Sequence, residues 1–267
     1  MEFSANLSIL FPELPFAERA AAAREAGFGA VECWWPFSEP DPDTAEVAGL
    51  VDTLDQAGVR LTGLNFFAGD MPGGERGILS HPGATGLFDA NLELIRRIAD
   101  QTGCRHFNAL YGQRLPGVDT ELQDRTAIRN LTRATDLLAD IGGVVLLEPL
   151  TAGENGDYPL LTPDDALRVI DRVGSPAVRL LFDAYHLTNN GVDVASSVTA
   201  LAPHIGHIQI ADSPGRGQPG TGDIDFAGFF SAVDAVGYDG VIGCEYRPQG
   251  PTAESFGWMR SVPSVAV

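Results

Sequence analysis

The sequence predicts an α/β protein that folds as a single (β/α)8 barrel, and two observations lead to that prediction. Short apolar or β-branched segments alternate with longer helical patterns, and eight such β-then-α units can be followed along the 267 residues. Alternation of this kind is typical of a parallel sheet, and eight units suggest a closed barrel. The main alternative, an open doubly wound sheet, is disfavoured because no G-x-G-x-x-G sequence follows the first predicted strand.

The predicted strands are short runs rich in apolar and β-branched residues, as expected of strands buried on both faces. They lie at residues 3–9, 30–34, 59–66, 105–110, 144–148, 179–183, 206–210 and 240–245. Each strand precedes a segment with helical patterning. The helical segments lie at residues 16–26, 44–57, 87–102, 120–141, from 162 onward, 194–202, 226–236 and 252–259, the last as a closing helix.

Local signals mark several helix ends. Gly27, Gly58 and Gly103 come directly after three helical segments, where glycine commonly ends a helix. Thr162 is placed to cap the fifth helix because its hydroxyl can accept from free backbone amides. Pro163 suits the first turn of that helix, where a missing N–H costs nothing.

The composition excludes two classes of enzyme. All 17 basic residues are arginine, so Schiff-base aldolases and pyridoxal phosphate enzymes, which need a lysine amine, are excluded. The formal net charge of −19 opposes binding to nucleic acid. Without a glycine-rich dinucleotide motif, no nucleotide cofactor is expected.

The organisation is expected to be one domain over residues 1–267, with a loose tail at 261–267. The three cysteines are widely spaced, which indicates buried free thiols rather than a zinc site or disulfides. No basic leader segment and no run of roughly 18 apolar residues is present, so a cytoplasmic location without a membrane partner is expected. A homo-oligomer is compatible with the sequence, although no segment marks an interface.

Polar side chains close four consecutive predicted strands. Glu148, Asp183, Gln209 and Glu245 each end or nearly end an apolar run, and each is about one βα unit from the next. In a barrel the carboxyl ends of the strands converge on one mouth. The four side chains are therefore expected to lie together.

Three converging carboxylates would repel one another strongly without a cation, and burying them is costly. A bound divalent metal ion removes both problems. Because the ligand set is three carboxylates and one amide oxygen, it favours one hard ion, Mg²⁺ or Mn²⁺, over zinc. The alternative for any one of these residues is that it caps a strand or binds a loop amide.

Strand alternation adds further expectations. If Glu245 points inward, Gly243 does also, and His207 points inward one layer below the mouth, as a core residue or a partner of the site. His186 and Arg216 lie in segments that follow two of these strands, and arginine can hold a carboxylate through two parallel hydrogen bonds.

Six short motifs resemble those of hydroxypyruvate isomerases, members of the xylose isomerase-like barrel superfamily, and the resemblance covers about residues 3–260. They are FSANLS at 3–8, GERG at 74–77, LEP at 147–149, DAYH at 183–186, the run from QIAD at 209–212 to GTG at 220–222, and GCEY at 243–246. The strand-seven run and the GCEY sequence are specific, whereas LEP alone would be weak.

The resemblance implies a function and a set of residue roles. Glu148, Asp183, Gln209 and Glu245 would bind the metal, and the two glutamates would exchange a proton with hydroxypyruvate through an enediolate, giving 2-hydroxy-3-oxopropanoate (tartronate semialdehyde). Three further residues are candidate substrate contacts. They are His186, which would orient an oxygen, Arg216, which would bind the substrate carboxylate, and Glu154, in the loop after the fifth strand.

Other functions remain alternatives. A 2-oxotetronate isomerase or a ketose 3-epimerase would use the same site, but related enzymes of those kinds usually carry histidine where this chain has Gln209. The run from Cys33 to Pro36 contains Trp34 and Trp35, which are bulkier than the resemblance predicts and leave the substrate open. More distant alternatives are an abasic-site endonuclease and a sugar-acid-binding barrel without catalysis.

Overall fold

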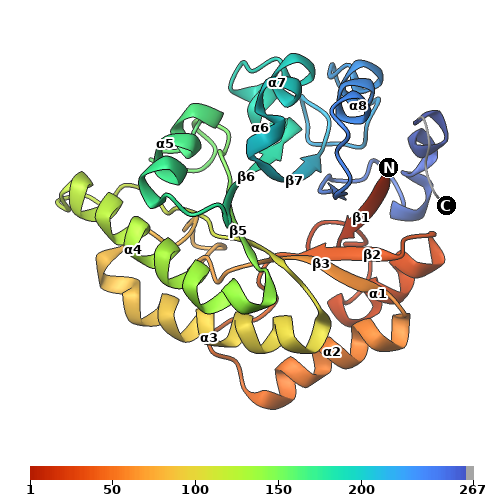
Figure 1. The fold of residues 1–267 in the computed structure, drawn as a ribbon. Helices are drawn as coiled ribbons and strands as arrows, with labels where there is room; N and C mark the ends of the chain where they lie inside the picture. Colours follow the sequence, from red (N-terminus) through yellow and green to blue (C-terminus); the bar gives the residue numbers. More distant parts are fainter. Residues whose placement is uncertain (263–267) are drawn as a thin grey trace.

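The computed structural model, which describes residues 1–262, is a closed barrel of eight parallel strands in the order β1 to β8 (Figure 1). Each strand pairs with the next, and β1 pairs with β8 to close the barrel. The strands are β1 (Glu2–Asn6), β2 (Ala30–Cys33), β3 (Arg60–Asn65), β4 (His106–Asn108), β5 (Val144–Leu147), β6 (Val178–Asp183), β7 (Ile205–Ile210) and β8 (Val241–Cys244). The predicted barrel is therefore confirmed.

Helices surround the strands. The α-helices are α1 (Phe16–Glu25), α2 (Thr44–Ala57), α3 (Thr85–Thr102), α4 (Thr120–Leu138), α5 (Pro163–Val173), α6 (Ala184–Asn189), α7 (Val194–Leu201) and α8 (Phe226–Ala235). The 3-10 helices are η1 (Pro82–Ala84), η2 (Ala139–Ile141), η3 (Ala202–His204), η4 (Thr252–Glu254) and η5 (Gly257–Ser261). None of the helices within residues 1–262 has the length and apolarity that a membrane crossing requires.

The helix-end signals work as expected. Gly58 and Gly103 adopt left-handed conformations, with φ of 65° and 76°, directly after α2 and α3. Before α5, the Thr162 hydroxyl accepts from the Asp165 N–H while the Asp165 carboxylate accepts from the Thr162 N–H. This reciprocal capping box satisfies amides that the helix itself leaves free.

Several elements differ from the predictions, most of them by one to three residues, and the larger differences lie near the two ends of the chain and after β6. The first strand ends at Asn6 rather than at residue 9, because the Asn6 carbonyl accepts from the Leu10 N–H and turns the chain. The predicted closing helix at 252–259 is instead the two short helices η4 and η5, and α6 was not predicted. Of the predicted tail, Ser261 ends η5 and Val262 is buried, while residues 263–267 lie outside the described residues.

The inside of the barrel holds a buried carboxylate. Glu32 on β2 accepts hydrogen bonds from Ser4 (3.0 Å), Asn6 (3.2 Å), His207 (2.8 Å) and Gln209 (2.7 Å). Burial pushes the pKa of Glu32 upward, but the charge of His207 and the hydrogen bonds outweigh it and hold that pKa below its usual value. An ionised glutamate thus links β1, β2 and β7, and His207 points inward as its partner.

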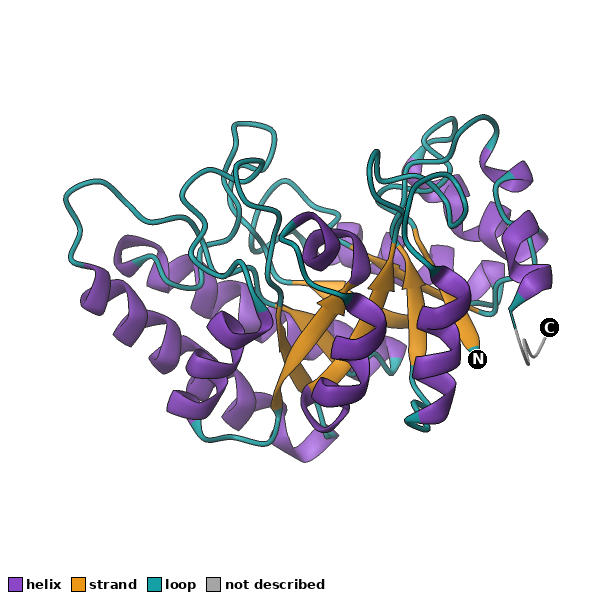
Figure 2. Ribbon diagram, turned by 90° about the horizontal axis from the view of Figure 1, so that it is seen from above, coloured by secondary structure: helices purple, strands orange, loops and turns teal. Residues whose placement is uncertain are grey.

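The mouth of the barrel is formed by the loops that follow the strands. Figure 2 shows these loops gathered at the end of the barrel toward which the strands point. In barrels of this kind the residues at this end, rather than those at the opposite end, form the functional site.

Gly243 is required by the carboxylate of Glu32. A Cβ atom at this position would lie 2.4 Å from Glu32 Oε1, and one at Gly63 would lie 3.2 Å from Glu32 Cβ. The carboxylate has little freedom to move away, because its four donors come from two different strands, β1 and β7. The two glycines therefore make the space in which Glu32 is buried.

We predict that Gly243→Ala lowers the free energy of unfolding by about 1–3 kcal/mol, because the added methyl group forces the Glu32 carboxylate out of its hydrogen bonds. Gly49→Ala is the matched control, since Gly49 is in α2 and a Cβ there meets nothing within 4 Å. The control should be neutral or stabilise by up to about 1 kcal/mol. Chemical denaturation curves of both variants measure the difference; equal stabilities would contradict the prediction.

Candidate active site

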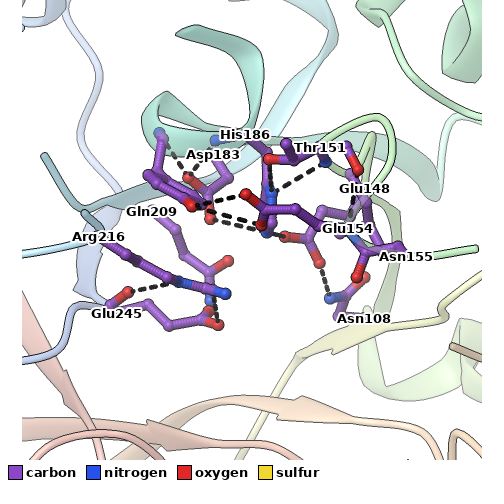
Figure 3. A network of polar contacts seen from close by, with 12 residues as sticks. Asn108, Glu148, Thr151, Glu154, Asn155, Asp183, His186, Gln209, Arg216 and Glu245 are labelled. Carbon is purple, nitrogen blue, oxygen red and sulfur yellow. Dashed lines mark hydrogen bonds and ion pairs between the residues drawn. The ribbon is translucent and has the colours of Figure 1, made fainter. Parts of the chain in front are cut away.

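The four residues predicted as ligands all lie at the mouth. Glu148 follows β5, Asp183 ends β6, Gln209 pairs with Asp183 across β6 and β7, and Glu245 follows β8. All four are buried. Figure 3 shows their side chains gathered around one space, as the strand-end pattern predicted.

Two of the carboxylates form a compact cluster with a histidine. One oxygen of Glu148, one oxygen of Asp183 and one ring nitrogen of His186 lie within 4.8 Å of one another, and all three residues are buried. A group of this size could hold a metal ion. Glu245 is not part of this cluster, because its carboxylate is held by Arg216 and Trp34 on the β8 side of the mouth.

Two oxygens of the four candidate ligands are buried without a partner among the described residues. Asp183 Oδ1 accepts from the Tyr185 N–H at 2.7 Å, whereas Oδ2 is buried and accepts nothing. Gln209 Nε2 donates to Glu32, so its Oε1 faces away from that carboxylate and is also buried without a partner. Buried acceptors without donors are costly, and a hard cation would satisfy both. The residues present therefore fit a divalent metal ion.

The carboxylates are also electrostatically unsatisfied. Burial, followed by the charges of Glu245 and Asp183, raises the pKa of Glu148 well above its usual range. Burial raises the pKa of Glu245 to about 8, with a further contribution from Asp183 and against the opposing charge of Arg216. Two neighbouring glutamates with raised pKa values indicate a site with an excess of negative charge.

His186 faces the carboxylates as a hydrogen-bond donor. The Thr151 N–H donates to His186 Nδ1 at 3.1 Å, and since a backbone N–H only donates, Nδ1 is unprotonated. Burial lowers the pKa of His186 to about 4, so the neutral ring carries its proton on Nε2. Nε2 lies 3.8 Å from Glu148 Oε1 and 3.9 Å from Asp183 Oδ2. In this tautomer His186 is suited to contact a substrate oxygen rather than to bind a metal.

Arg216 is held in a strained backbone conformation at the mouth. Its φ of 57° is unusual for a residue other than glycine. Nη2 donates to Glu245 Oε1 at 2.6 Å, and the guanidinium lies over the Tyr185 ring at 5.2 Å from its centroid. Arg216 Nε also donates to the Glu245 carbonyl at 3.4 Å, and Arg216 is among the residues that line the cavity at the mouth.

Glu154 lies at the outer rim. It is exposed, and the Tyr185 hydroxyl donates to its two oxygens at 3.3 and 3.4 Å. Glu154, Arg216 and Glu245 all line a cavity of about 980 Å³ at the mouth. The three predicted substrate contacts, His186 included, therefore border one space.

Sequence reasoning missed several residues of the site, and it singled out Trp34 only for its bulk. Asn108, which ends β4, donates to Glu148 Oε2 at 2.7 Å, and Trp34, after β2, donates from its indole to Glu245 Oε1 at 3.0 Å. Glu32 orients Gln209, and Thr151 orients His186. Glu32 and Asn108 stand two residues before the ends of the predicted strands 30–34 and 105–110, so a pattern of polar residues at strand ends does not single them out.

Comparisons with known proteins show what this chain is similar to. The sequence profile of the xylose isomerase-like TIM barrel family matches residues 20–262. A Streptomyces coelicolor protein provisionally named hydroxypyruvate isomerase is 46% identical over 264 residues, covering 96% of this chain and 95% of its own. The hydroxypyruvate isomerase of Escherichia coli is 35% identical, covering 97% of this chain and 98% of its own.

Other relatives carry different names. Proteins named 2-oxo-tetronate isomerase are between 31% and 33% identical over nearly the whole chain. A crystal structure described as an AP endonuclease of family 2 from Brucella melitensis superposes with a TM-score of 0.90 at 32% identity, covering 98% of this chain and 99% of its own. The expected resemblance to the hydroxypyruvate isomerases is confirmed.

We predict that stabilisation by Mg²⁺ grows with pH between about 6 and 8.5. The raised pKa values of Glu148 and Glu245 mean that the metal-free folded protein holds protons that the unfolded chain releases. In the metal-free protein, the stability that these bound protons contribute to the folded state is fully present below the usual glutamate pKa. It is lost as the pH rises through the raised pKa values. Because metal ligands must be deprotonated, the affinity for Mg²⁺ should rise up to about tenfold per pH unit for each proton displaced.

Thermal unfolding with and without MgCl₂ at both ends of this pH range measures the effect. Glu148→Gln is the informative variant, since it removes one titrating ligand and should weaken both the Mg²⁺ effect and its pH dependence. An equal Mg²⁺-induced shift at pH 6 and pH 8.5 in the unaltered protein would contradict the prediction.

Proposed function

We propose that this chain, which belongs to the hydroxypyruvate isomerase family of xylose isomerase-like TIM barrels, interconverts hydroxypyruvate and 2-hydroxy-3-oxopropanoate with the help of one divalent metal ion. The observation that carries the proposal is the cluster of buried carboxylates around two unpartnered oxygens at the mouth. Isomerisation of a hydroxy-carbonyl acid requires proton transfer between neighbouring carbons, and this site places carboxylates on both sides of one space.

The metal would be held by Glu148, Asp183, Gln209 and Glu245, and Mg²⁺ or Mn²⁺ suits their oxygen atoms. When bound, such an ion polarises a carbonyl and stabilises negative charge on neighbouring oxygens. The unpartnered Asp183 Oδ2 and Gln209 Oε1 support this assignment. The remaining residues bind the substrate, orient it and move its protons.

Glu148 and Glu245 are the proposed proton-transfer groups. They follow β5 and β8, so they approach the cavity from different sides of the mouth (Figure 3). One carboxylate takes a proton from C3, and the other returns a proton to C2 from the opposite face. The proton of the C3 hydroxyl moves to the oxygen on C2, so that the C3 alcohol becomes the aldehyde and the C2 ketone becomes the alcohol. Atoms and charge balance without an oxidant or reductant.

His186 and Arg216 are the proposed substrate-binding residues. His186 Nε2–H would donate to a substrate oxygen, since the contact with Thr151 keeps the proton on that nitrogen. Arg216 would bind the substrate carboxylate through guanidinium donors other than the Nη2–H on Glu245. Glu154, exposed at the rim, would contact only the outer end of a substrate.

A 2-oxotetronate is the second candidate substrate. Relatives with that name are nearly as similar as the E. coli hydroxypyruvate isomerase, and the cavity of about 980 Å³ has room for an acid with a fourth carbon. The same glutamates would perform the same transfer on it. A ketose 3-epimerase would differ by moving the proton between the two faces of one carbon.

The deciding experiment is an assay of the purified protein on hydroxypyruvate with Mg²⁺ or Mn²⁺, in which any tartronate semialdehyde is reduced by a coupling enzyme. A chelated sample is the control. Metal-dependent turnover supports the proposal, whereas turnover only of 2-oxotetronates or ketoses assigns the site to those substrates. Cleavage of abasic DNA, or ligand binding without any turnover, would overturn the isomerase proposal.

We predict that Glu245→Gln lowers kcat by about 10²- to 10⁴-fold, because the amide keeps the shape of the side chain but cannot take up a proton. Circular dichroism should show that the fold is retained. Glu25→Gln is the matched control, because Glu25 is an exposed residue at the end of α1 and the substitution removes the same charge. Near-normal turnover by Glu245→Gln would rule out its assigned role.

A further inference from the structure

Glu245 is held by two donors on the same oxygen. Arg216 Nη2 lies 2.6 Å from Glu245 Oε1, and Trp34 Nε1 lies 3.0 Å from the same atom. Among the residues that the structure describes, no donor reaches the other oxygen, Oε2. The carboxylate therefore presents one oxygen to the protein and the other to the cavity.

Trp34 is itself fixed in place by the end of the barrel. It comes directly after β2, and its backbone N–H donates to the Ser8 hydroxyl at 2.9 Å. The Ser8 N–H in turn donates to Asn6 Oδ1 at 3.0 Å, and Asn6 donates to the buried Glu32. The indole is thus attached through a continuous set of hydrogen bonds to the interior of the barrel, so its N–H has a defined direction.

The neighbouring tryptophan has a different role. Trp35 donates from its indole to the Glu39 carbonyl, within its own loop, at 2.8 Å. Its ring packs edge-on against Phe37, with the centroids 5.1 Å apart. Two adjacent tryptophans therefore direct their N–H groups to different places, and only Trp34 reaches a residue of the candidate site.

We infer that Trp34 is a positioning residue for Glu245, which fixes Oε1 so that Oε2 is the oxygen that exchanges a proton with the substrate. This inference rests on the proposed function. The indole matters because Arg216 has two tasks: its guanidinium holds Glu245 and is also the group proposed to bind the substrate carboxylate. When a substrate draws Arg216 toward itself, the Trp34 N–H keeps the carboxylate of Glu245 in place. A neutral donor is suited to this task, since the substrate carboxylate attracts it far less than it attracts the guanidinium.

The first experiment compares Trp34→Phe with Trp35→Phe, which lose the same N–H group from adjacent positions. Loss of a hydrogen bond to a charged group should lower kcat of Trp34→Phe about 10- to 100-fold. KM should stay within about twofold, because the N–H acts on the orientation of Glu245 and not on His186 or Arg216, the residues proposed to bind the substrate. Trp35→Phe should retain kcat within about twofold. Equal kcat values for the two variants would overturn the inference.

A second variant separates the N–H from the bulk of the ring. Replacement of Trp34 by 3-benzothienylalanine keeps the bicyclic ring and exchanges the N–H for sulfur. It should reproduce the loss of kcat seen with Trp34→Phe while the melting temperature stays unchanged. Full activity of this variant would show that Trp34 acts only by filling space, and would overturn the inference.

A third measurement does not depend on turnover. The chain has three tryptophans, so an ¹H–¹⁵N spectrum should contain three indole signals, which single substitutions of Trp34, Trp35 and Trp258 assign. Glu245→Gln should shift the Trp34 signal and leave the Trp258 signal in place. An unshifted Trp34 signal would refute the contact, whereas a shifted signal in a protein without isomerase activity would refute the proposed function and leave the contact intact.

Discussion

The burial of carboxylates inside one barrel is the constraint on which the rest of this structure depends. Glu32, Glu148, Asp183 and Glu245 are each no more than 4% exposed, and burial of an ionised group is costly unless other groups compensate. The extent to which hydrogen bonds compensate for the buried charge differs between the interior of the barrel and its mouth. Glu32, deep inside, accepts hydrogen bonds from four donors on two strands, β1 and β7. Nearer the mouth the compensation is incomplete, and Asp183 keeps an oxygen without a partner.

The two depths are connected through one amide. Gln209 donates from its nitrogen to Glu32, which fixes the direction of its oxygen toward the mouth. A carboxylate that takes no part in the proposed chemistry thereby decides which atom of Gln209 is available to a cation. The glycines at 63 and 243 belong to the same arrangement, because side chains there would occupy the space of the Glu32 carboxylate. The packing around Glu32 inside the barrel therefore also determines which oxygen atoms are available to bind a metal ion at the mouth.

The two glutamates proposed to move protons have different surroundings. Asn108 donates to Glu148, and the neutral His186 faces it, so within residues 1–262 no cation contacts this carboxylate. Glu245 lies against Arg216 and receives a second donor from Trp34. Carboxylates in unlike environments are suited to unlike tasks in one reaction. The asymmetry comes from the loops after β2 and β7, the parts of the mouth where this chain carries Trp34 and Arg216.

The sequence by itself determined the barrel and most of the residues at its mouth. Eight alternating units and polar residues at strand ends are local patterns, and the topology of a barrel brings such ends together whatever the details of packing. Glu148, Asp183, Gln209 and Glu245 could therefore be found from their positions alone. The short helix α6 and the early end of β1 could not, since they depend on single side-chain and carbonyl contacts that no periodicity records.

Only the tertiary structure decided how the candidate site is held. The pairing of Trp34 with Glu245 joins residues that are 211 positions apart, and that of Glu32 with Gln209 joins residues 177 positions apart. The proton position on His186 follows from a backbone amide of another loop. Contacts of this kind are set by side-chain directions across the closed barrel, and a linear sequence contains the residues but not the directions in which they point.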